Sequence, residues 1–300
     1  MITASDYKEK IKEMRRNSLP TPFDIAYDSF LELKFDSMNK AYFMENASDF
    51  ISEMRAQCWK DFQAYEKEFT VQALSSLIHA ESFKDMTPHE AIKKFISDYP
   101  EHIYELTLSN TQSRRSRAGK EFEAIIEMLL IGAGIPTDSQ GNVGKQFFAK
   151  HNLGKLVDFV IPGAIQYSID KQRTVLISAK TTLRERWQEV PEEVSRTGAP
   201  HMYLATLDSN ITENTLHVLY ESNITIVTTK ENLKSYNNPR IITFEELIAE
   251  ASSAADKWNG HQYSTKQKSV LDTFLRKQID KHAKHPTIRD YYKGRLAECL

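Results

Sequence analysis

An acid, a lysine and several further acids fall within one stretch of the chain, residues 156–193. Asp158 lies in a short β-branched and aromatic run that ends at Pro162-Gly163, and Lys180 ends a second such run, 174–180. Runs of this kind predict β-strands, and if the two strands pair, both side chains project toward the same end of one sheet. Mg²⁺ takes carboxylate ligands, and a metal ion beside a lysine suits phosphodiester hydrolysis. The stretch therefore indicates a metal-dependent nuclease, although an Asp and a Lys at strand ends are more often solvated charges.

The elements around these residues follow from the patterns beside them. Residues 164–169 form a possible strand between the two runs, and Thr181 and Thr182 offer N-cap chemistry for a following helix. That helix would carry a series of charged residues, namely Arg184, Glu185, Arg186, Glu189 and Glu193. Strand-like runs at 201–206, 224–229 and 241–243 alternate with helix-like runs at 213–221 and 244–258. This alternation predicts an α/β core.

A second group of acids lies on an amphipathic helix predicted at about 117–131. The polar and basic stretch 109–120 leads into it, and its buried face would be Phe122, Ile125, Ile126, Leu129 and Leu130. Glu121 and Glu123 lie on opposite edges of this face and Glu127 lies further out. Helical geometry does not choose among the three, and solvated surface glutamates are the plain alternative.

A third candidate region is a helix predicted from Ser48, as its N-cap, to about Glu66. Phe50, Met54, Cys58, Phe62 and Tyr65 form one apolar stripe along it. Trp59 falls about 100° off that stripe, and Arg55 sits one turn before it on the same flank. On the residues alone, the pair is best interpreted as half-buried packing.

These residues resemble the PD-(D/E)xK nucleases, and within them the type II restriction endonucleases of the SsoII, PspGI and EcoRII group, which read CC…GG sites. The resemblance is carried by the segments Ser178 to Trp187 and Gln112 to Lys120, and with weaker matches it covers about residues 50–230. The general nuclease pattern has an acid two residues before the lysine, where this chain has Ser178. The subgroup moves that acid onto the following helix, where Glu193 matches and Glu189 and Glu192 are rivals.

The resemblance implies a fold and a set of site residues. The fold is α/β, a mixed central sheet flanked by helices, in a single endonuclease domain over 1–300. Within it, 1–105 is a mainly helical portion, 106–260 the catalytic core and 261–300 a basic helical segment. The implied catalytic residues are Asp158, Lys180, Glu193 and Glu123, with Asp158 and Glu193 as Mg²⁺ ligands. The implied base-reading residues are Arg184, Glu185, Arg186 and Gln112, and the pocket for extruded bases is Arg55 and Trp59.

The chemistry of the Arg-Glu-Arg run fits that role. Arginine pairs bidentately with guanine, and glutamate accepts from the cytosine amino group, so the run matches adjacent G·C pairs. The alternative for the run alone is a salt-bridged helix surface. The basic cluster of Arg114, Arg115, Arg117 and Lys120 is predicted to contact the DNA backbone.

The predicted function is therefore a Mg²⁺-dependent type II restriction endonuclease that cuts double-stranded DNA at a palindromic, interrupted CC-N-GG type site and flips the central bases. A palindromic site implies a homodimer, and a restriction enzyme implies a cognate DNA methyltransferase as a functional partner. Two alternatives are a structure-selective repair or junction nuclease of the same fold, and a catalytically inactive DNA-binding regulator, for which Ser178 is the argument.

Composition sets outer limits on these predictions. The 300 residues are 40% apolar and 27% charged with a net charge of −2, which is typical of a globular protein and argues against indiscriminate nucleic-acid binding. No segment has the order of a signal peptide or the length of a membrane span, so a cytoplasmic protein without a membrane partner is expected. The two cysteines, Cys58 and Cys299, are too few for a disulfide framework or a thiolate zinc site. The basic segment from Lys266 onward is most simply a solvated helix face.

Overall fold

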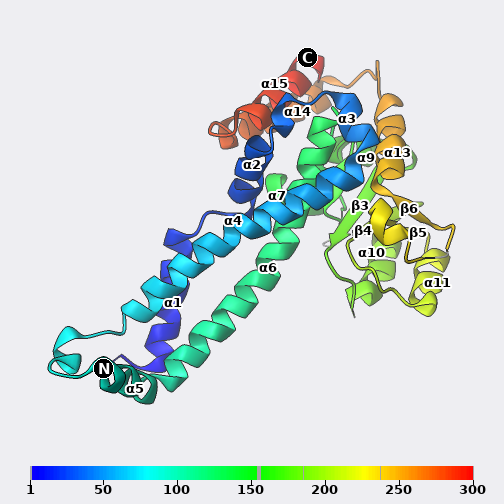
Figure 1. The fold of residues 1–300 in the computed structure, drawn as a ribbon. Coiled ribbons are helices and arrows are strands. Elements are labelled where there is room, and N and C mark those ends of the chain that lie inside the picture. Colours follow the sequence, from blue (N-terminus) through cyan, green and yellow to red (C-terminus); the bar gives the residue numbers. More distant parts are fainter. Residues whose placement is uncertain (1, 154–156, 185, 237, 300) are drawn as a thin grey trace.

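The computed structural model describes residues 2–153, 157–184, 186–236 and 238–299, which form an α/β body and a projecting helical arm (Figure 1). The body contains one six-stranded sheet in the order β1-β2-β3-β4-β5-β6. Its strands are β1 (Asp138–Ser139), β2 (Phe159–Ile161), β3 (Val175–Lys180), β4 (Met202–Thr206), β5 (Ile224–Thr228) and β6 (Ile241–Thr243). β2 pairs antiparallel with β1 and β3, whereas β3 to β6 are parallel. The predicted mixed sheet flanked by helices is confirmed.

Helices surround this sheet and build the arm. The N-terminal ones are α1 (Ala4–Ser18), α2 (Pro22–Glu32), α3 (Lys40–Glu45), α4 (Ala47–Ser75), α5 (Pro88–Asp98) and α6 (Pro100–Gly132). The middle ones are α7 (Gln140–Val143), α8 (Lys145–Lys150), α9 (Ala164–Ile169), α10 (Glu189–Thr197), α11 (Glu213–Glu221) and α12 (Lys230–Leu233). The last are α13 (Phe244–Asp256), α14 (Thr265–Lys281) and α15 (Pro286–Cys299). In the described part of the chain, no helix is both long enough and apolar enough to cross a bilayer.

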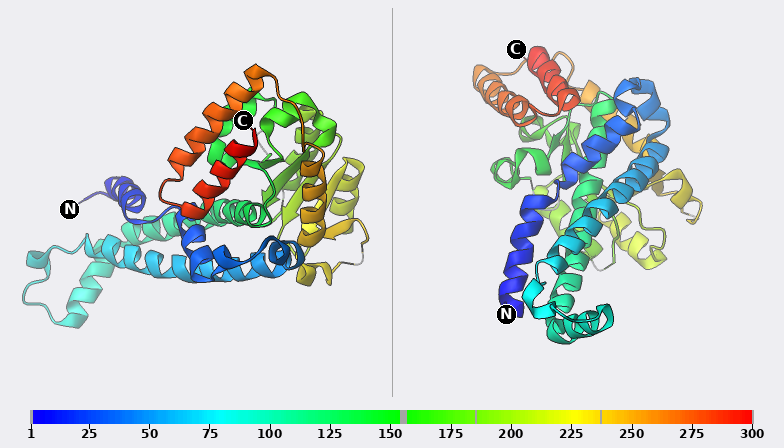
Figure 2. Two further views of the ribbon diagram at one scale, coloured as in Figure 1. Left: turned by 90° about the horizontal axis from the view of Figure 1, so that it is seen from above. Right: turned by 60° about the vertical axis from the view of Figure 1, so that its left-hand side comes forward.

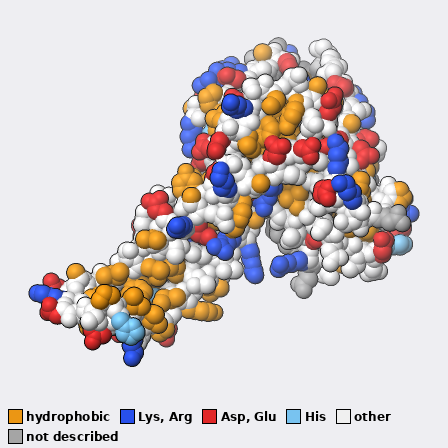
Figure 3. Space-filling view, in the orientation of Figure 1, with side chains coloured by type: hydrophobic (Ala, Val, Ile, Leu, Met, Phe, Trp, Pro, Cys, Tyr) orange, Lys and Arg blue, Asp and Glu red, His pale blue; other side chains and the backbone are white. Residues whose placement is uncertain are grey.

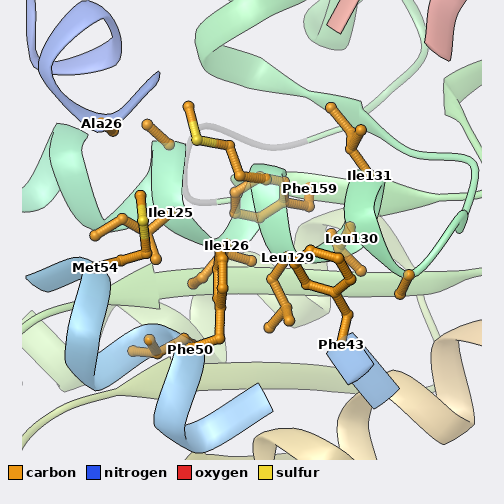
Figure 4. Close-up of a cluster of buried hydrophobic side chains, with 14 of the residues drawn as sticks. Ala26, Phe43, Phe50, Met54, Ile125, Ile126, Leu129, Leu130, Ile131 and Phe159 are labelled. Carbon is orange, nitrogen blue, oxygen red and sulfur yellow. The ribbon is translucent and has the colours of Figure 1, made fainter. Parts of the chain in front are cut away.

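Alternate strand residues divide the core into two layers. Ile177 of β3 faces a cluster that contains α4, α13 and the C-terminal half of α6, and Leu176 faces a second cluster with α10 and α11. Figure 4 shows Ile125, Ile126 and Leu129 of α6 packed between α4 and the sheet. This is the period-two alternation expected of strands buried on both faces. The C-terminal half of α6 is thus fixed across the sheet.

The arm has a smaller core of its own, in which Tyr7 and Ile11 of α1 pack against Phe69 of α4 and Leu106 of α6. The right-hand view in Figure 2 shows α1, α4 and α6 running side by side out of the body. Arg114 of α6 forms an ion pair with the buried Glu66 of α4, with 2.8 Å between its Nε and Oε2. The N-terminal half of α6 is therefore held by tertiary contacts.

Two helix boundaries differ from the sequence prediction because of these contacts. Residues 109–120 are part of α6, so Gln112 lies on a helix and is exposed there instead of lying in a loop. α4 continues to Ser75, and its buried stripe passes from Phe62 to Phe69, while Tyr65 is 39% exposed. Ser48 is not the N-cap of α4, because its hydroxyl donates to Glu245 and accepts from the backbone of Lys230.

Two further predictions about local structure are wrong. Residues 164–169 form α9 and not a strand, because β2 and β3 pair directly and leave no space between them. Thr181 and Thr182 do not cap a helix: the chain turns with φ +41° at Arg184, and α10 begins only at Glu189 after a 3₁₀ turn at Arg186–Gln188. The basic C-terminal segment forms two helices, since α14 ends at Lys281 and Pro286 begins α15.

The α14–α15 hairpin is joined to the sheet by a buried arginine. Arg295 of α15 donates to Asp138 Oδ1 at 3.0 Å and to the carbonyl oxygen of Thr137 at 2.7 Å. The second carboxylate oxygen of Asp138 accepts from the backbone of Ala164, at the start of α9. One ion pair therefore connects α15, the edge strand β1 and the turn that follows β2.

We expect Arg295→Ala to destabilise the protein by about 3–5 kcal/mol, because it leaves the Asp138 carboxylate buried without its cation. Lys293→Ala on the same helix, which removes an exposed ion pair with Asp290, should cost about 1 kcal/mol or less. Urea unfolding of both variants measures the difference. Equal losses would show that the buried pair contributes nothing particular to stability.

Candidate active site

The antiparallel pairing of β2 with β3 brings Asp158 and Lys180 together. Asp158 extends β2 by one residue, since its backbone N–H donates to the carbonyl of Ile177. Its Oδ2 accepts from Lys180 Nζ at 3.0 Å and from the backbone N–H of Ala179 at 2.7 Å. Both side chains are almost completely buried, with 7% of Asp158 and 6% of Lys180 exposed. Both hydrogen bonds end on Oδ2, so Oδ1 can serve another ligand.

Glu123 on α6 faces this pair. Burial, and after it the charge of Asp158, raises the pKa of Glu123 to about 7, while Lys180 and Lys120 act in the opposite direction. A buried carboxyl group whose pKa is raised by burial and by a neighbouring carboxylate is typical of a functional site. The electrostatic coupling of Glu123 to both Asp158 and Lys180 therefore gives this glutamate a place in the candidate site.

The other two glutamates of this helix have different environments. Glu121 forms an ion pair with Arg55 of α4. Glu127 is fully enclosed and accepts from Ser139 at 2.9 Å and from Asn142. The structure thus separates three side chains that helical geometry alone left equivalent.

The donor set of this site fits a hard divalent cation. Asp158 and Glu123 supply carboxylate oxygens, and repulsion between them would be relieved by a positive ion. Among the described residues no group of three His, Cys, Asp or Glu side chains converges as a metal cage. Mg²⁺ does not require one, because it usually retains waters and takes one or two carboxylates together with substrate phosphate.

Comparison with known proteins decides the family. The model of the family described as EcoRII C terminal matches residues 62–248. The chain is also 51% identical over 298 residues to the type II restriction enzyme SsoII of Shigella sonnei, with 99% of this chain and 98% of that protein covered. The chain belongs to this family of type II restriction enzymes. It is a site-specific deoxyribonuclease, so the interpretation as an inactive regulator is not supported.

Solved structures agree with this assignment. Ecl18kI, in a metal-depleted complex with uncleaved, modified DNA, superposes with a TM-score of 0.92 at 48% identity over 99% of this chain and 100% of that one. A complex of the restriction endonuclease PspGI with substrate DNA gives a TM-score of 0.60 at 19% identity, with 81% and 96% of the two chains covered. The second similarity concerns the fold alone.

The predicted third acid of the restriction enzyme lies on α10. Ser178, which stands in place of the acid of the general pattern, is fully buried in β3. Glu189 and Glu192 are exposed at the start of α10, and Glu192 pairs with Arg196. Glu193 belongs to α10, but its side chain lies outside the described part of the structure.

The predicted reader segment follows Lys180 closely. Arg184 is exposed and Leu183 is buried in the core. Arg186 begins the 3₁₀ turn before α10, and its side chain, like the whole of Glu185, is outside the described residues. A pocket of about 450 Å³ is lined on one side by Thr182, Leu183, Arg184 and Trp187 and on the other by the loop that follows β4.

The predicted base pocket lies on α4 where it passes α6. Trp59 is 42% exposed, as expected from its position off the apolar stripe. Its ring lies 6.0 Å from that of Phe62, and the guanidinium carbon of Arg114 lies 5.8 Å from its centroid. Arg55 is fixed by its ion pair with the buried Glu121. The indole is therefore partly exposed and lies between Phe62 and Arg114 on a helix packed against α6.

The residues predicted to contact the DNA backbone differ in whether they already have partners within the protein. Arg115 and Lys120 are exposed on α6. Arg117 is half-buried, donates to the carbonyl of Pro20 and lies over the ring of Phe62. Figure 3 shows Lys and Arg side chains gathered where the arm meets the body, and apolar side chains exposed on the arm.

Two residues near the site were not predicted from the sequence. Asp208, in the loop after β4, accepts a hydrogen bond from the backbone N–H of Leu183 at 3.0 Å. Asn142 joins Glu127 to the C-terminal helices, because its Oδ1 contacts Lys281 and the ring of His282. The turn sequence Asp208-Ser209-Asn210 was the available signal for Asp208, but its partner Leu183 lies in the segment that follows another strand, β3.

The enclosed Glu127 predicts a pH dependence of stability. Burial raises its pKa to about 7, and hydrogen bonds from Ser139 and Asn142 only partly oppose this. A raised pKa contributes stability that is present below its ordinary value near 4.5 and is lost as the pH rises through about 7. Glu127→Gln, which is never charged, should therefore gain melting temperature relative to wild type between about pH 5 and about pH 8.

The exposed Glu231→Gln serves as the control, and its melting temperature relative to wild type should not change over the same range. Thermal unfolding of the three proteins in matched buffers gives the result. A difference between Glu127→Gln and wild type that stays constant with pH would contradict a raised pKa at this position.

Proposed function

We propose that this enzyme is a Mg²⁺-dependent endonuclease that hydrolyses double-stranded DNA at a palindromic, interrupted CC-N-GG type site. The observation that carries the proposal is the buried contact between Asp158 and Lys180, with Glu123 coupled to both. It stands in a chain similar over nearly its whole length to SsoII, and to Ecl18kI, which was solved metal-depleted with uncleaved DNA.

The residues have separate tasks in this reaction. Asp158, and Glu193 of α10, would hold Mg²⁺, which when bound would supply positive charge for the transition state and lower the pKa of its water. The ammonium group of Lys180, 3.0 Å from the Asp158 carboxylate, orients the attacking water or a phosphate oxygen at the same place. Glu123 supports the site from α6. Strand ends and a packed helix hold these groups rigidly, as positioning for phosphoryl chemistry requires.

DNA recognition is assigned to the surface beside this site. Arg184, Glu185 and Arg186 read the C·G pairs and Gln112 contacts a base from α6. Phosphate contacts are assigned to the basic residues of α6, namely Arg114, Arg115, Arg117 and Lys120. Arg115 and Lys120 are the best placed of these, because Arg114 and Arg117 already have protein partners.

The site's two-fold symmetry calls for a homodimer. The arm exposes apolar side chains that its own core does not use, including Val71, Ile78, Ile92, Ile96 and Tyr104. A patch of this kind is typical of protein contacts, and we assign it to the second copy. The enzyme would act in the cytoplasm beside a methyltransferase that modifies the same site.

Asp158→Ala and Lys180→Ala should each abolish cleavage while binding of the specific site stays measurable, because these residues serve the metal and the water. Chelation of Mg²⁺ should do the same to wild type, and added Mg²⁺ should restore it. Plasmid digestion and gel-shift assays provide the measurements. The same digest of Glu189→Ala, Glu192→Ala and Glu193→Ala identifies the third acid. Normal cleavage by Asp158→Ala or Lys180→Ala would contradict the assignment of these two residues to the active site.

Trp59 is proposed to receive an extruded central base. Stacking of a base on an aromatic ring is worth about 1–3 kcal/mol, and two such pockets in a dimer would largely offset the cost of unpairing the central bases. Extrusion would also shorten the distance between the CC and GG halves. The exposed indole and the rigid Arg55–Glu121 pair support this role.

A 2-aminopurine at the central position should therefore change its fluorescence strongly when the wild-type enzyme binds. Trp59→Ala should weaken binding of the specific site by about 1–3 kcal/mol per pocket and of random DNA much less. Tyr65→Ala, an exposed aromatic residue of the same helix, is the control. Emission that stays as in free duplex during tight specific binding would show a stacked central pair.

A further inference from the structure

The segment that carries the reading residues is held in an unusual backbone conformation. Arg184 has a φ of +41°, a region that non-glycine residues rarely occupy and that persists only where the surroundings impose it. On one side the segment borders the pocket of about 450 Å³, so packing there is incomplete. Something close to Arg184 must therefore fix the chain.

Asp208 makes that contact. Its Oδ2 accepts from the backbone N–H of Leu183, the residue directly before Arg184, at 3.0 Å. The contact follows from sheet register, because Lys180 at the end of β3 lies opposite Thr206 at the end of β4. The loop after β4 thereby meets the segment after β3. The hydrogen bond joins the two sides of the pocket, which are formed by these same two segments.

The loop that holds Asp208 is itself firmly fixed. The backbone N–H of Asp208 donates to Thr206 Oγ1 at 3.1 Å, and its other carboxylate oxygen, Oδ1, accepts from Asn210 N at 3.2 Å. The Tyr236 hydroxyl donates to the carbonyl of Asp208 at 2.8 Å and accepts from the backbone of Ile211. Because these hydrogen bonds fix the loop, the side chain of Asp208 can hold the backbone of Leu183 in place.

We propose that Asp208 is a positioning residue for sequence reading. It holds the backbone at Leu183 so that Arg184 keeps its conformation and presents its guanidinium to the bases. The inference rests on the proposed reading role of Arg184. Asp208 contacts neither the reacting phosphate nor a base in this scheme, and its effect passes through the segment between Lys180 and Arg184.

The test compares affinity for the specific site with affinity for random DNA. In Asp208→Ala the ratio of the two affinities should fall by about tenfold, since one part-buried N–H loses its acceptor, with little change on random DNA. Asp208→Asn should restore most of the ratio, because its amide oxygen accepts the same N–H. Tyr236→Phe, which loosens the loop without touching the carboxylate, should lower the ratio less.

The matched control is Asp170→Ala. Asp170 also accepts a backbone N–H in a turn, but it precedes β3 and lies at the opposite end of that strand from Lys180. Its loss should leave the ratio at the wild-type value even if the melting temperature falls. A reduced ratio in Asp170→Ala equal to that of Asp208→Ala would overturn the proposal, because general destabilisation would then explain both.

A double mutant separates this inference from the proposed function. If Asp208 acts through Arg184, then Asp208→Ala combined with Arg184→Ala should lose no more discrimination than Arg184→Ala alone. Additive losses would overturn the proposal. A wild-type ratio in Arg184→Ala would overturn the reading role itself. A wild-type ratio in Asp208→Ala beside a reduced ratio in Arg184→Ala would overturn the positioning role alone.

Discussion

The buried contact between Asp158 and Lys180 is the constraint on which the body of this enzyme depends. Taking two charges out of water is costly unless further hydrogen bonds compensate, and here the backbone of Ala179 and its carbonyl supply them. These partners exist only in one register of β2 against β3. A slip by one residue would turn Asp158 to the other face of the sheet. The contact between Asp158 and Lys180 and the pairing of β2 with β3 therefore depend on each other.

The helix α6 shows how one element takes on several roles through its surroundings. Along two turns it places Glu121 against Arg55, Glu123 within electrostatic reach of Asp158 and Lys180, and Glu127 in an enclosed network with Asn142. Its apolar residues hold the same turns against α4 and the sheet. The N-terminal half continues into the arm, where Arg114 and Glu66 join it to α4. The part of α4 that carries Trp59 is thus packed against the same helix that carries Glu123 of the candidate site.

The sequence predicts those elements whose patterns are local. The strands β4 to β6 and the helix α11 match because alternating or amphipathic runs there are bounded by clear turn residues. The errors concern segments fixed by distant partners: residues 109–116 are helical because of the arm, and Thr181 and Thr182 are non-helical because Leu183 is bound to Asp208. In the site, residue type suggests Asp158 and Lys180. The residue pattern alone leaves Glu123 equivalent to Glu121 and Glu127, and beyond the family resemblance it becomes distinct through the electrostatics of the folded chain.

Under the proposed roles of Arg184 in reading and Lys180 in catalysis, the shortness of one segment couples the two functions mechanically. Arg184 follows Lys180 by four residues, and four residues span at most about 14 Å of extended chain. The turn at Arg184 shortens this reach further. Lys180 is fixed by Asp158 at one end, and Leu183 is fixed by its burial and by Asp208 near the other. A wrong base pair, which cannot form hydrogen bonds with the reading side chains, would displace the segment that begins at Lys180. Because Lys180 must stay within hydrogen-bond distance of the reacting groups, such a displacement costs rate as well as affinity. Under these proposed roles, discrimination at the chemical step follows from the same short connection that provides discrimination in binding.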